Sequence, residues 1–526
     1  MTADPPGDPA APASAPAPAS APAPVPVPAP SLGRLFRNAS IYGVGQFLVS
    51  LIGLVADPIL SHLLTLADFG LVGLTRSVNN LLANFYRLGL EGAAGRFYYD
   101  VEHDPAARRR LIGSLNSFLL GWLLLLTALQ EVFGPAVYAR VFDGVPYAPY
   151  GRFVAYGLLC NGLIAVAQTV WAAQENAGRI VKLRILTALL SNAALFGLLV
   201  TTHLGVLSIF WSQVLGPTVM LYVHLRFAWG VFGFAWDPQV IRKALAFSLP
   251  MVVHLTSHWI LDAADRIMLE RYLGRDAVGL YSTAYASTST LLMVNGAING
   301  AYVPQFIRAF DKPEQRSFVA RAITYFLGAA AAATLGYLAF APTVIRAVYA
   351  AQFEAAAPLT QPLALSAFFH ALYLIYVNGL FQAKRTGMIP VYTTLAGLVN
   401  VGLNFWWIPR LGVAGAAWAT LAGYVALFLV FRFGCNRVVR LPFERGRIAR
   451  LLGAAGVAAA GAWLIDGRFS LWIEVPAKIG LVLAAPFLLV AAGFLTHEER
   501  MWISTRIARW RGKSMETPPA GGGAGA

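Results

Sequence analysis

The sequence contains little charge and almost no cysteine. Asp, Glu, Lys and Arg make up 12% of its 526 residues, against about 25% in a typical soluble domain, and 57% of the residues are hydrophobic. A chain of this composition cannot cover its surface with polar groups, which excludes an ordinary soluble enzyme. Its two cysteines, Cys160 and Cys435, are too few for a disulfide framework or a four-cysteine zinc site.

Motifs of common enzyme and metal sites are also missing. The sequence contains no G-x-x-x-x-G-K-[ST] phosphate-binding loop, no H-E-x-x-H and no G-x-S-x-G. We therefore expect no enzymatic activity, no cofactor and no bound metal. The formal net charge of +15 could indicate a nucleic-acid partner. In a membrane protein, however, Lys and Arg gather on cytoplasmic loops and give a basic total without a polyanion, so we expect no nucleic acid.

The first residues differ from the rest of the chain. Residues 1–31 are almost wholly Ala, Pro and Ser, with neither Lys nor Arg. Such a tract cannot bury apolar surface, and we predict a disordered tail. A secretory signal peptide needs a basic start that this tract lacks, so we expect the first hydrophobic segment to be retained.

Apolar runs of about 20 residues, the length that crosses a hydrocarbon core as a helix, follow one another after Arg37. They predict an all-α membrane protein with about fourteen transmembrane helices. The predicted limits are 38–60, 69–91, 111–133, 152–173, 181–201, 205–228, 244–268, 278–303, 319–341, 358–382, 388–408, 412–433, 448–466 and 476–496.

The distribution of basic residues predicts the orientation of these helices. If the N-terminus is cytoplasmic, 29 of the 40 Lys and Arg residues lie at the inner ends of the spans or between them, and 8 lie on the outer side. The three that remain within spans are Arg76, Arg87 and Arg266. Because cytoplasmic segments carry the excess of positive charge, we predict that both termini are cytoplasmic.

An internal repeat relates the two halves of the chain. Residues 64–71 (LTLADFGL) resemble residues 273–280 (LGRDAVGL) at an offset of 209, which aligns Gly70 with Gly279. Two further matches follow in the same order at offsets of 209 and 207, and six spans separate the copies. An even number of spans gives a parallel repeat, which in secondary transporters places a substrate cavity between two lobes.

This repeat predicts the domain organisation. Two six-helix lobes surround a central cavity, two helices follow them, and a tail lies at each end. The predicted parts are a cytoplasmic tail at 1–31, an N-terminal lobe at 32–230, a C-terminal lobe at 231–436, two additional helices at 437–497 and a basic, then Gly-rich, cytoplasmic tail at 498–526.

The second span is unusually polar for a transmembrane helix. It carries Arg76, Asn80, Asn84, Arg87 and Glu91, which fall within about 80° of a helical wheel. A charge at mid-bilayer costs roughly 2.5–3.5 kcal/mol, so this stripe should face a cavity. One hypothesis is a wall that binds an anion through Arg76, Asn80, Asn84 and Arg87, with Arg76 as the main ligand. The alternative is a structural ladder in which Arg87 pairs with Glu91 four residues later.

The seventh span also carries ionisable residues on one face. These residues are His254, His258, Asp262 and Asp265. One hypothesis is ion or proton coupling, because histidine titrates near neutral pH and buried carboxyl groups change their pKa. Asp57 in the first span and Glu91 are further candidates for coupling. The alternative is structural, with Asp262 paired to Arg266 and both histidines packed and hydrogen-bonded; the histidine spacing alone does not indicate a metal site.

Three segments resemble one known family. They are LFRNASIYGVGQFLVSLIGLVADPILSHLLTLADFGLVGL near the start, ADRIMLERYLGRDAVGLYSTAYA at 264–286 and LNFWWIPRLGVAGAAWATLAGY at 403–424. They resemble the oligosaccharide flippase branch of bacterial polysaccharide transporters, in the superfamily that also holds multidrug and toxic compound extruders. The resemblance covers residues 32–435. Within it, Gly70, Gly279, Asp265 and Arg266 are signature positions and Arg76 is the candidate anion contact.

The resemblance implies a flippase in the bacterial inner membrane. Its substrate would be a polyprenyl-diphosphate-linked oligosaccharide that crosses to the outer leaflet for O-antigen, capsule or exopolysaccharide assembly. Transport would use alternating access and a coupling cation, either a proton or sodium. Membrane lipid would surround the chain, and its partners would be the polysaccharide polymerase and glycosyltransferases of the same pathway.

Two other functions have sequence signatures of their own. A cation-coupled multidrug exporter of the same superfamily should have an acidic, aromatic cavity rather than an arginine-bearing one. A membrane polymerase or ligase of glycans should have a large outer loop with basic catalytic residues. The longest predicted outer loop covers residues 134–151, which is too short to favour that activity.

Overall fold

The computed structural model describes residues 32–142, 144–174, 176–227, 234–310, 312–501 and 505. The predicted tail at 1–31 and most of the tail at 498–526 lie outside the described residues. Within the described part, the chain is helical and contains no strand. This architecture confirms the prediction of an all-α protein.

In the described part of the chain, fourteen helices of 21 to 37 residues form the bundle. Each predicted span overlaps one of them, and the short helix α3 (Leu90–Tyr98) is additional. The long helices are α1 (Leu32–Ser61), α2 (Leu66–Arg87), α4 (Pro105–Val141), α5 (Arg152–Ala173), α6 (Ala177–Thr201), α7 (Leu207–Phe227), α8 (Pro238–Leu273), α9 (Arg275–Phe310), α10 (Arg316–Val348), α11 (Thr360–Gln382), α12 (Met388–Leu411), α13 (Val413–Val438), α14 (Arg445–Ile465) and α15 (Leu471–Ala491).

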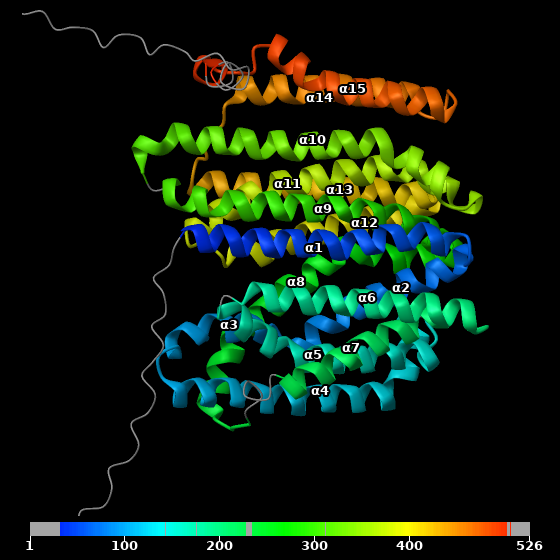
Figure 1. Ribbon diagram of the computed structural model, residues 1–526, viewed down its shortest axis with the longest axis vertical. Coiled ribbons are helices and arrows are strands. Elements are labelled where there is room, and N and C mark those ends of the chain that lie inside the picture. The colour runs from blue at the N-terminus through cyan, green and yellow to red at the C-terminus, as the bar shows by residue number, and fades with distance from the viewer. Residues whose placement is uncertain are drawn as a thin grey trace, which may run out of the picture.

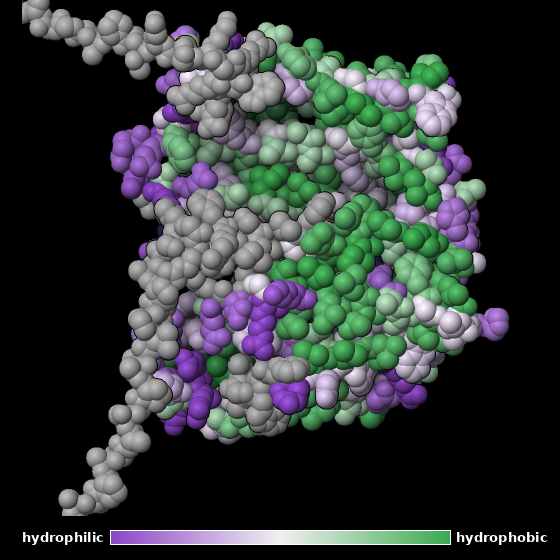
Figure 2. Space-filling model, in the orientation of Figure 1, coloured by the Kyte–Doolittle hydropathy of each residue, from purple (hydrophilic) through white to green (hydrophobic). Residues whose placement is uncertain are grey.

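The helices lie side by side along one direction, as a membrane bundle requires. The first described turn of α1 and the last turn of α15 lie at the same end (Figure 1). Among the described residues, ten helices are long and apolar enough to cross a membrane. Figure 2 shows a hydrophobic belt over the middle of the bundle, with hydrophilic residues at both ends. The chain is a multi-pass membrane protein.

Capping residues, which hydropathy does not detect, determine where several helices begin. Asp104 caps α4 and Asp237 caps α8, each through hydrogen bonds from backbone amides, and proline occupies the first helical position in both. Thr65 and Asp68 form a reciprocal capping box at the start of α2. These caps extend α4 and α8 by six residues beyond the predicted spans, at their N-terminal ends.

The second predicted span is wrong as a single helix. Helix α2 ends at Arg87, and Leu88 and Gly89 take left-handed backbone conformations with φ of 50° and 65°. Glycine adopts such a conformation without steric penalty, and α3 starts at the next residue, Leu90. The last span is also displaced, because α15 covers 471–491 rather than 476–496.

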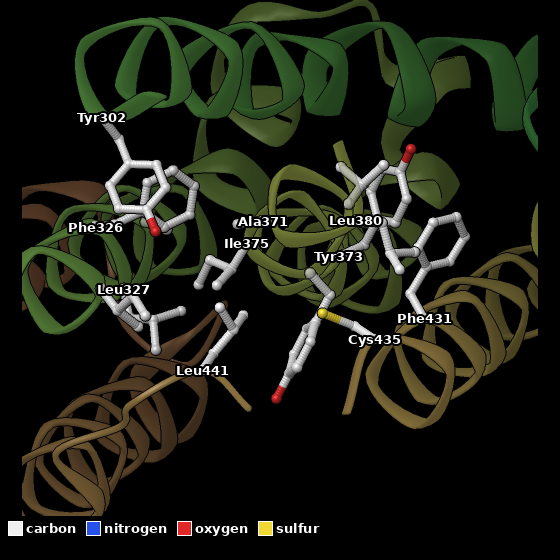
Figure 3. Close-up of a cluster of buried hydrophobic side chains, with 14 of the residues drawn as sticks. Tyr302, Phe326, Leu327, Ala371, Tyr373, Ile375, Leu380, Phe431, Cys435 and Leu441 are labelled. Carbon is white, nitrogen blue, oxygen red and sulfur yellow. The ribbon is translucent and has the colours of Figure 1, made fainter. Parts of the chain in front are cut away.

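Aromatic and aliphatic side chains fill the bundle around α11. Figure 3 shows Tyr373, Ile375 and Leu380 of α11 facing Phe326 of α10 and Phe431 of α13. A second cluster joins α2 with α8 and α9 through residues such as Leu74, Leu269 and Tyr281. In lipid, helices associate through close packing and polar contacts rather than by exclusion of water. The packing of α2 against α8 and α9 therefore holds the two predicted lobes together.

Candidate functional site

The polar residue Arg76 lies on the wall of three adjoining cavities, of about 220, 420 and 350 Å³. The first lies among α1, α2, α6, α7 and α9, the second among α2, α8 and α9, and the third between α1 and α9. Ala286 of α9 also lines all three. We call them together the central cavity.

Arg76 is the exposed cation of this cavity. No hydrogen bond or ion pair joins its side chain to another described residue. Asp57 of α1 lines two of the same cavities and interacts electrostatically with Arg76, although their charged atoms do not approach within 4 Å. An arginine inside a bundle needs water or an anion to stabilise its charge, because desolvation without a partner is costly. The cavity provides space for either.

The predicted polar stripe divides into two parts in the structure. Asn80 and Asn84 line the second cavity beside Arg76. Arg87 and Glu91 do not line the central cavity; Arg87 Nη1 lies 2.9 Å from Glu91 Oε1. Of the two sequence interpretations, the local pair is therefore the arrangement found at Arg87. The break at Leu88 and Gly89 separates this pair from the rest of the stripe.

Helix α8 places His258 and Asp262 on the opposite wall. His258 Nδ1 lies 2.8 Å from Asp262 Oδ2, and both side chains are partly exposed to the second cavity. Tyr424 of α13 and Tyr285 of α9 donate hydrogen bonds to the other oxygen of Asp262. This carboxylate therefore connects three helices of the predicted C-terminal lobe.

The predicted side-chain pair between Asp262 and Arg266 is wrong. Arg266 Nη1 donates to the backbone carbonyl of Asp262 at 2.7 Å and lies 3.5 Å from Asp265 Oδ1. Its guanidinium stacks over the ring of Tyr285, 4.3 Å from the centroid, and lines the second cavity. The spacing of residues along α8 does not reveal this contact of Arg266, because Tyr285 lies on α9.

Asp265 and His254 point away from the central cavity. Asp265 is fully buried and accepts hydrogen bonds from Tyr281 of α9 and from Thr420 of α13, the latter at 3.2 Å. His254 lies 3.4 Å from Thr393 of α12. The four residues predicted on one face of α8 are thus divided. His258 and Asp262 line the cavity, whereas Asp265 and His254 lie in the packing surface with α12 and α13.

One functional candidate, His370 of α11, was not selected from the sequence. Its ring centroid lies 6.5 Å from that of His258 and 5.8 Å from that of Tyr424. Its Nδ1 atom is buried without a hydrogen-bond partner among the described residues. A histidine in an apolar span can indicate a functional residue. The contacts of His370 with His258 and Tyr424 cannot be predicted from its own span, because these residues lie on other helices. No group of three or more metal-binding side chains gathers in the described part of the chain.

Gly70 and Gly279 lie where α2 and α9 touch. A Cβ on Gly70 would lie 2.1 Å from the carbonyl oxygen of Arg275, and one on Gly279 would lie 2.1 Å from that of Leu66. Neighbouring Gly73 packs against Ser282, which lines the central cavity. The contact therefore borders the cavity at the ends where α2 and α9 begin.

A bundle of apolar helices around a polar internal cavity is the architecture of a membrane transporter. The chain matches the family described as polysaccharide biosynthesis protein over residues 35–310. It belongs to this family, as its sequence resemblance predicted, and is a transporter of polysaccharide biosynthesis.

Two curated relatives illustrate the family. The chain is 25% identical over 419 residues to the succinoglycan biosynthesis transport protein ExoT of Rhizobium meliloti, covering 74% of this chain and 75% of that protein. It is 23% identical over 298 residues to the Lsg locus putative protein 1 of Haemophilus influenzae, covering 53% and 67% of the two chains. Both are distant relatives by sequence.

Solved structures show the same fold. The lipid II flippase MurJ in an inward closed conformation superposes with a TM-score of 0.69 at 13% identity, over 85% of this chain and 97% of that chain. An inward-facing multidrug transporter of the MATE family gives a TM-score of 0.58 at 14% identity, over 78% and 95%. The chain therefore shares its fold with these two solved structures.

Proposed function

We propose that the chain is a flippase for a polyprenyl-diphosphate-linked oligosaccharide. It moves this substrate from the cytoplasmic to the outer leaflet of a bacterial inner membrane, with both of its termini cytoplasmic. The product serves O-antigen, capsule or exopolysaccharide assembly. The observation that carries the proposal is Arg76, a cavity arginine with no acidic partner within 4 Å among the described residues.

Arg76 acts on the diphosphate. A diphosphate cannot cross hydrocarbon unaided, and a charge-assisted hydrogen bond from a guanidinium offsets part of its desolvation. Asn80 and Asn84, on the same wall, supply amide groups for the sugar hydroxyls, while the prenyl chain stays in lipid. Arg266 lies on the opposite wall, where Asp265, 3.5 Å away, offsets its charge.

Two lobes carry the movement. Residues 32–230 and 231–436 rock about the central cavity, and residues 437–497 add two helices to the second lobe. The tight contact between the starts of α2 and α9 supports an outer gate that is closed in this conformation. Opening requires these two helices to separate at Gly70 and Gly279.

Ion coupling acts through His258 and Asp262, with His370 nearby. This pair faces the cavity and also reaches α9 and α13 through the tyrosines that bind Asp262. A proton or sodium ion taken up here changes the charge of the wall and the contacts among three helices. Asp57 is a second candidate, because it lines the cavity with Arg76.

A multidrug exporter would use a different charge pattern. A cation-selective cavity should present unpaired acidic and aromatic groups. The second cavity does contain Trp259 and Asp262, but Asp262 is paired with His258 while Arg76 has no ion pair among the described residues. Asp57 is an acidic group with no ion pair within 4 Å among the described residues, but it lines the first and third cavities and not the second. The charge balance of the second cavity therefore favours an anionic substrate.

Complementation of a deletion strain tests the proposal. Wild-type chain and Arg76→Lys should restore surface polysaccharide, whereas Arg76→Ala should leave it absent and cause the lipid-linked intermediate to accumulate, as detected by mass spectrometry. Arg109→Ala is the matched control, since Arg109 is exposed on α4 and lies far from the cavity wall in sequence. Normal polysaccharide in the Arg76→Ala strain, at an equal protein level in the membrane, rejects the proposal.

A further inference from the structure

A second concave site lies outside the central cavity, among α10, α11, α13 and α14. It has a volume of about 680 Å³. Its apolar lining includes Leu327, Leu372, Tyr376, Phe428, Ile448 and Leu452. Its polar lining consists of Arg432, Asn436, Arg440 and Arg445, and none of the described lining residues is acidic. We call this site the inner groove.

The arginines of the inner groove have no acidic partner. Arg432, Arg440 and Arg445 are exposed, and no hydrogen bond or ion pair joins their side chains to another residue in the described ranges. Three positive charges thus converge from α13, the linker after it and the start of α14. Like charges gathered at one pocket repel one another unless an anion lies between them.

Neighbouring arginines at the same end have hydrogen-bond or ion-pair partners. Arg447 pairs with Glu444 and Glu499, each at 2.9 Å, and Arg450 donates to the carbonyl of Gly493 at 2.7 Å. The nearby acidic groups therefore pair with Arg447, on the side of α14 that faces the segment after α15. An arginine excess from membrane topology alone does not explain why the uncompensated residues surround an apolar pocket.

Unpaired arginines beside apolar side chains suit an amphiphile that carries a phosphate. Guanidinium groups bind phosphate oxygens in a bidentate manner, and apolar walls such as those at Phe428 and Leu452 suit a hydrocarbon chain. In the proposed orientation, the arginines lie at the cytoplasmic interface, where phosphate headgroups of the inner leaflet are found. A free phosphate ion would leave the apolar walls unused.

We propose that the inner groove binds the phosphate of an inner-leaflet lipid, with the lipid chain against the apolar walls. The site is separate from the central cavity and shares none of its lining residues. The phosphate can come from an anionic phospholipid or from a prenyl phosphate. Each basic residue near a membrane surface contributes about fivefold to binding of such a headgroup.

The test uses the purified full chain in detergent. Native mass spectrometry measures its binding of phosphatidylglycerol, polyprenyl phosphate and zwitterionic phosphatidylcholine. We expect phosphatidylglycerol or polyprenyl phosphate to bind at least tenfold more tightly than phosphatidylcholine, and the better of the two identifies the source. The triple variant Arg432→Gln, Arg440→Gln, Arg445→Gln should lose about 100-fold, and each single variant about fivefold.

The control is Arg437→Gln on the same helix. Arg437 is exposed but lies over the ring of Phe433 and does not line the groove. It should bind lipid like the wild type. Triple variant binding equal to wild type, with an unchanged elution volume and thermal midpoint, overturns the proposal, as does equal binding of phosphatidylcholine. If the triple variant misfolds, the single variants decide between these outcomes.

Discussion

Gly70 and Gly279 make the same contact with exchanged roles across the start of α2 and α9. Each lies against a backbone carbonyl in the first turn of the other helix, at an equal Cβ distance of 2.1 Å, and the two carbonyls, of Leu66 and Arg275, are also 209 residues apart. A contact of residue i with j and of j with i is the signature of a two-fold axis. Here it relates two copies of a repeat within one chain.

Alanine at either glycine should open this contact. A methyl group cannot occupy a position 2.1 Å from a backbone oxygen, so Gly70→Ala and Gly279→Ala should separate the starts of α2 and α9. A cysteine at Ser282, on the cavity wall, should then react at least threefold faster with a maleimide added from outside. Cys160 and Cys435 are buried and contribute little background.

Gly296→Ala on α9 is the control for these variants. A Cβ there would meet no atom within 4 Å, so labelling should not change. Equal labelling of all three variants and the parent would show that the glycines do not hold the outer contact closed.

A buried ion cluster fastens the last two helices to α10. Lys478 of α15 is fully buried and lies 2.5 Å from Asp466 and 2.7 Å from Glu474, while Arg346 of α10 lies 2.6 Å from Asp466. Removing one partner leaves an uncompensated buried charge, which typically costs about 3–5 kcal/mol. Lys478→Met should therefore lower the thermal midpoint in detergent, whereas exposed Arg468→Gln should not. An unchanged midpoint for Lys478→Met contradicts this role.

The same cluster predicts an acid-sensitive step in stability. Burial raises the pKa of Asp466, but hydrogen bonds from Arg346 and Lys478 outweigh it, so the pKa is lowered overall. A carboxyl group with a lowered pKa stabilises the fold above its ordinary pKa and loses this contribution as the pH falls through the folded value. The thermal midpoint should thus fall below about pH 4, and Asp466→Asn should reduce that fall. An identical acid profile for Asp466→Asn would refute the assignment.

His258 and Asp262 should control ion dependence rather than substrate binding. Asp262→Asn and His258→Gln remove the pair that joins the cavity wall to α9 and α13. We expect uptake of lipid-linked sugar into proteoliposomes to lose its response to an imposed proton or sodium gradient, while substrate still binds. His203→Gln, in the loop after α6, is the control and should keep the response. A gradient response that survives Asp262→Asn places coupling elsewhere.

The sequence predicts the parts of this molecule that depend on local composition. Helix length and hydropathy located each long helix, and the spacing of Arg76, Asn80 and Asn84 placed them on one wall, because both follow from a 3.6-residue period. Where a predicted span contains a break between two helices, as at Leu88 and Gly89, hydropathy alone predicts one helix instead of two.

The missed features depend on partners distant in the chain. Lys478 is one of the eight basic residues that the topology places on the outer side, and the structure buries it against Asp466 and Thr343. Likewise, Arg266 finds Tyr285 rather than Asp262, and His370 approaches His258 from a helix 112 residues later in the sequence. Side-chain spacing along one helix carries no information about these contacts.

Translocation in a purified system tests the role of Arg76 most directly. Proteoliposomes would contain a fluorescent polyprenyl-diphosphate oligosaccharide, and the fraction that becomes accessible to a membrane-impermeant quencher would be followed with time. The wild type should translocate the lipid, Arg76→Lys should do so more slowly, and Arg76→Ala should match protein-free vesicles. Translocation by Arg76→Ala at the wild-type rate would contradict the account of an arginine that carries the diphosphate across.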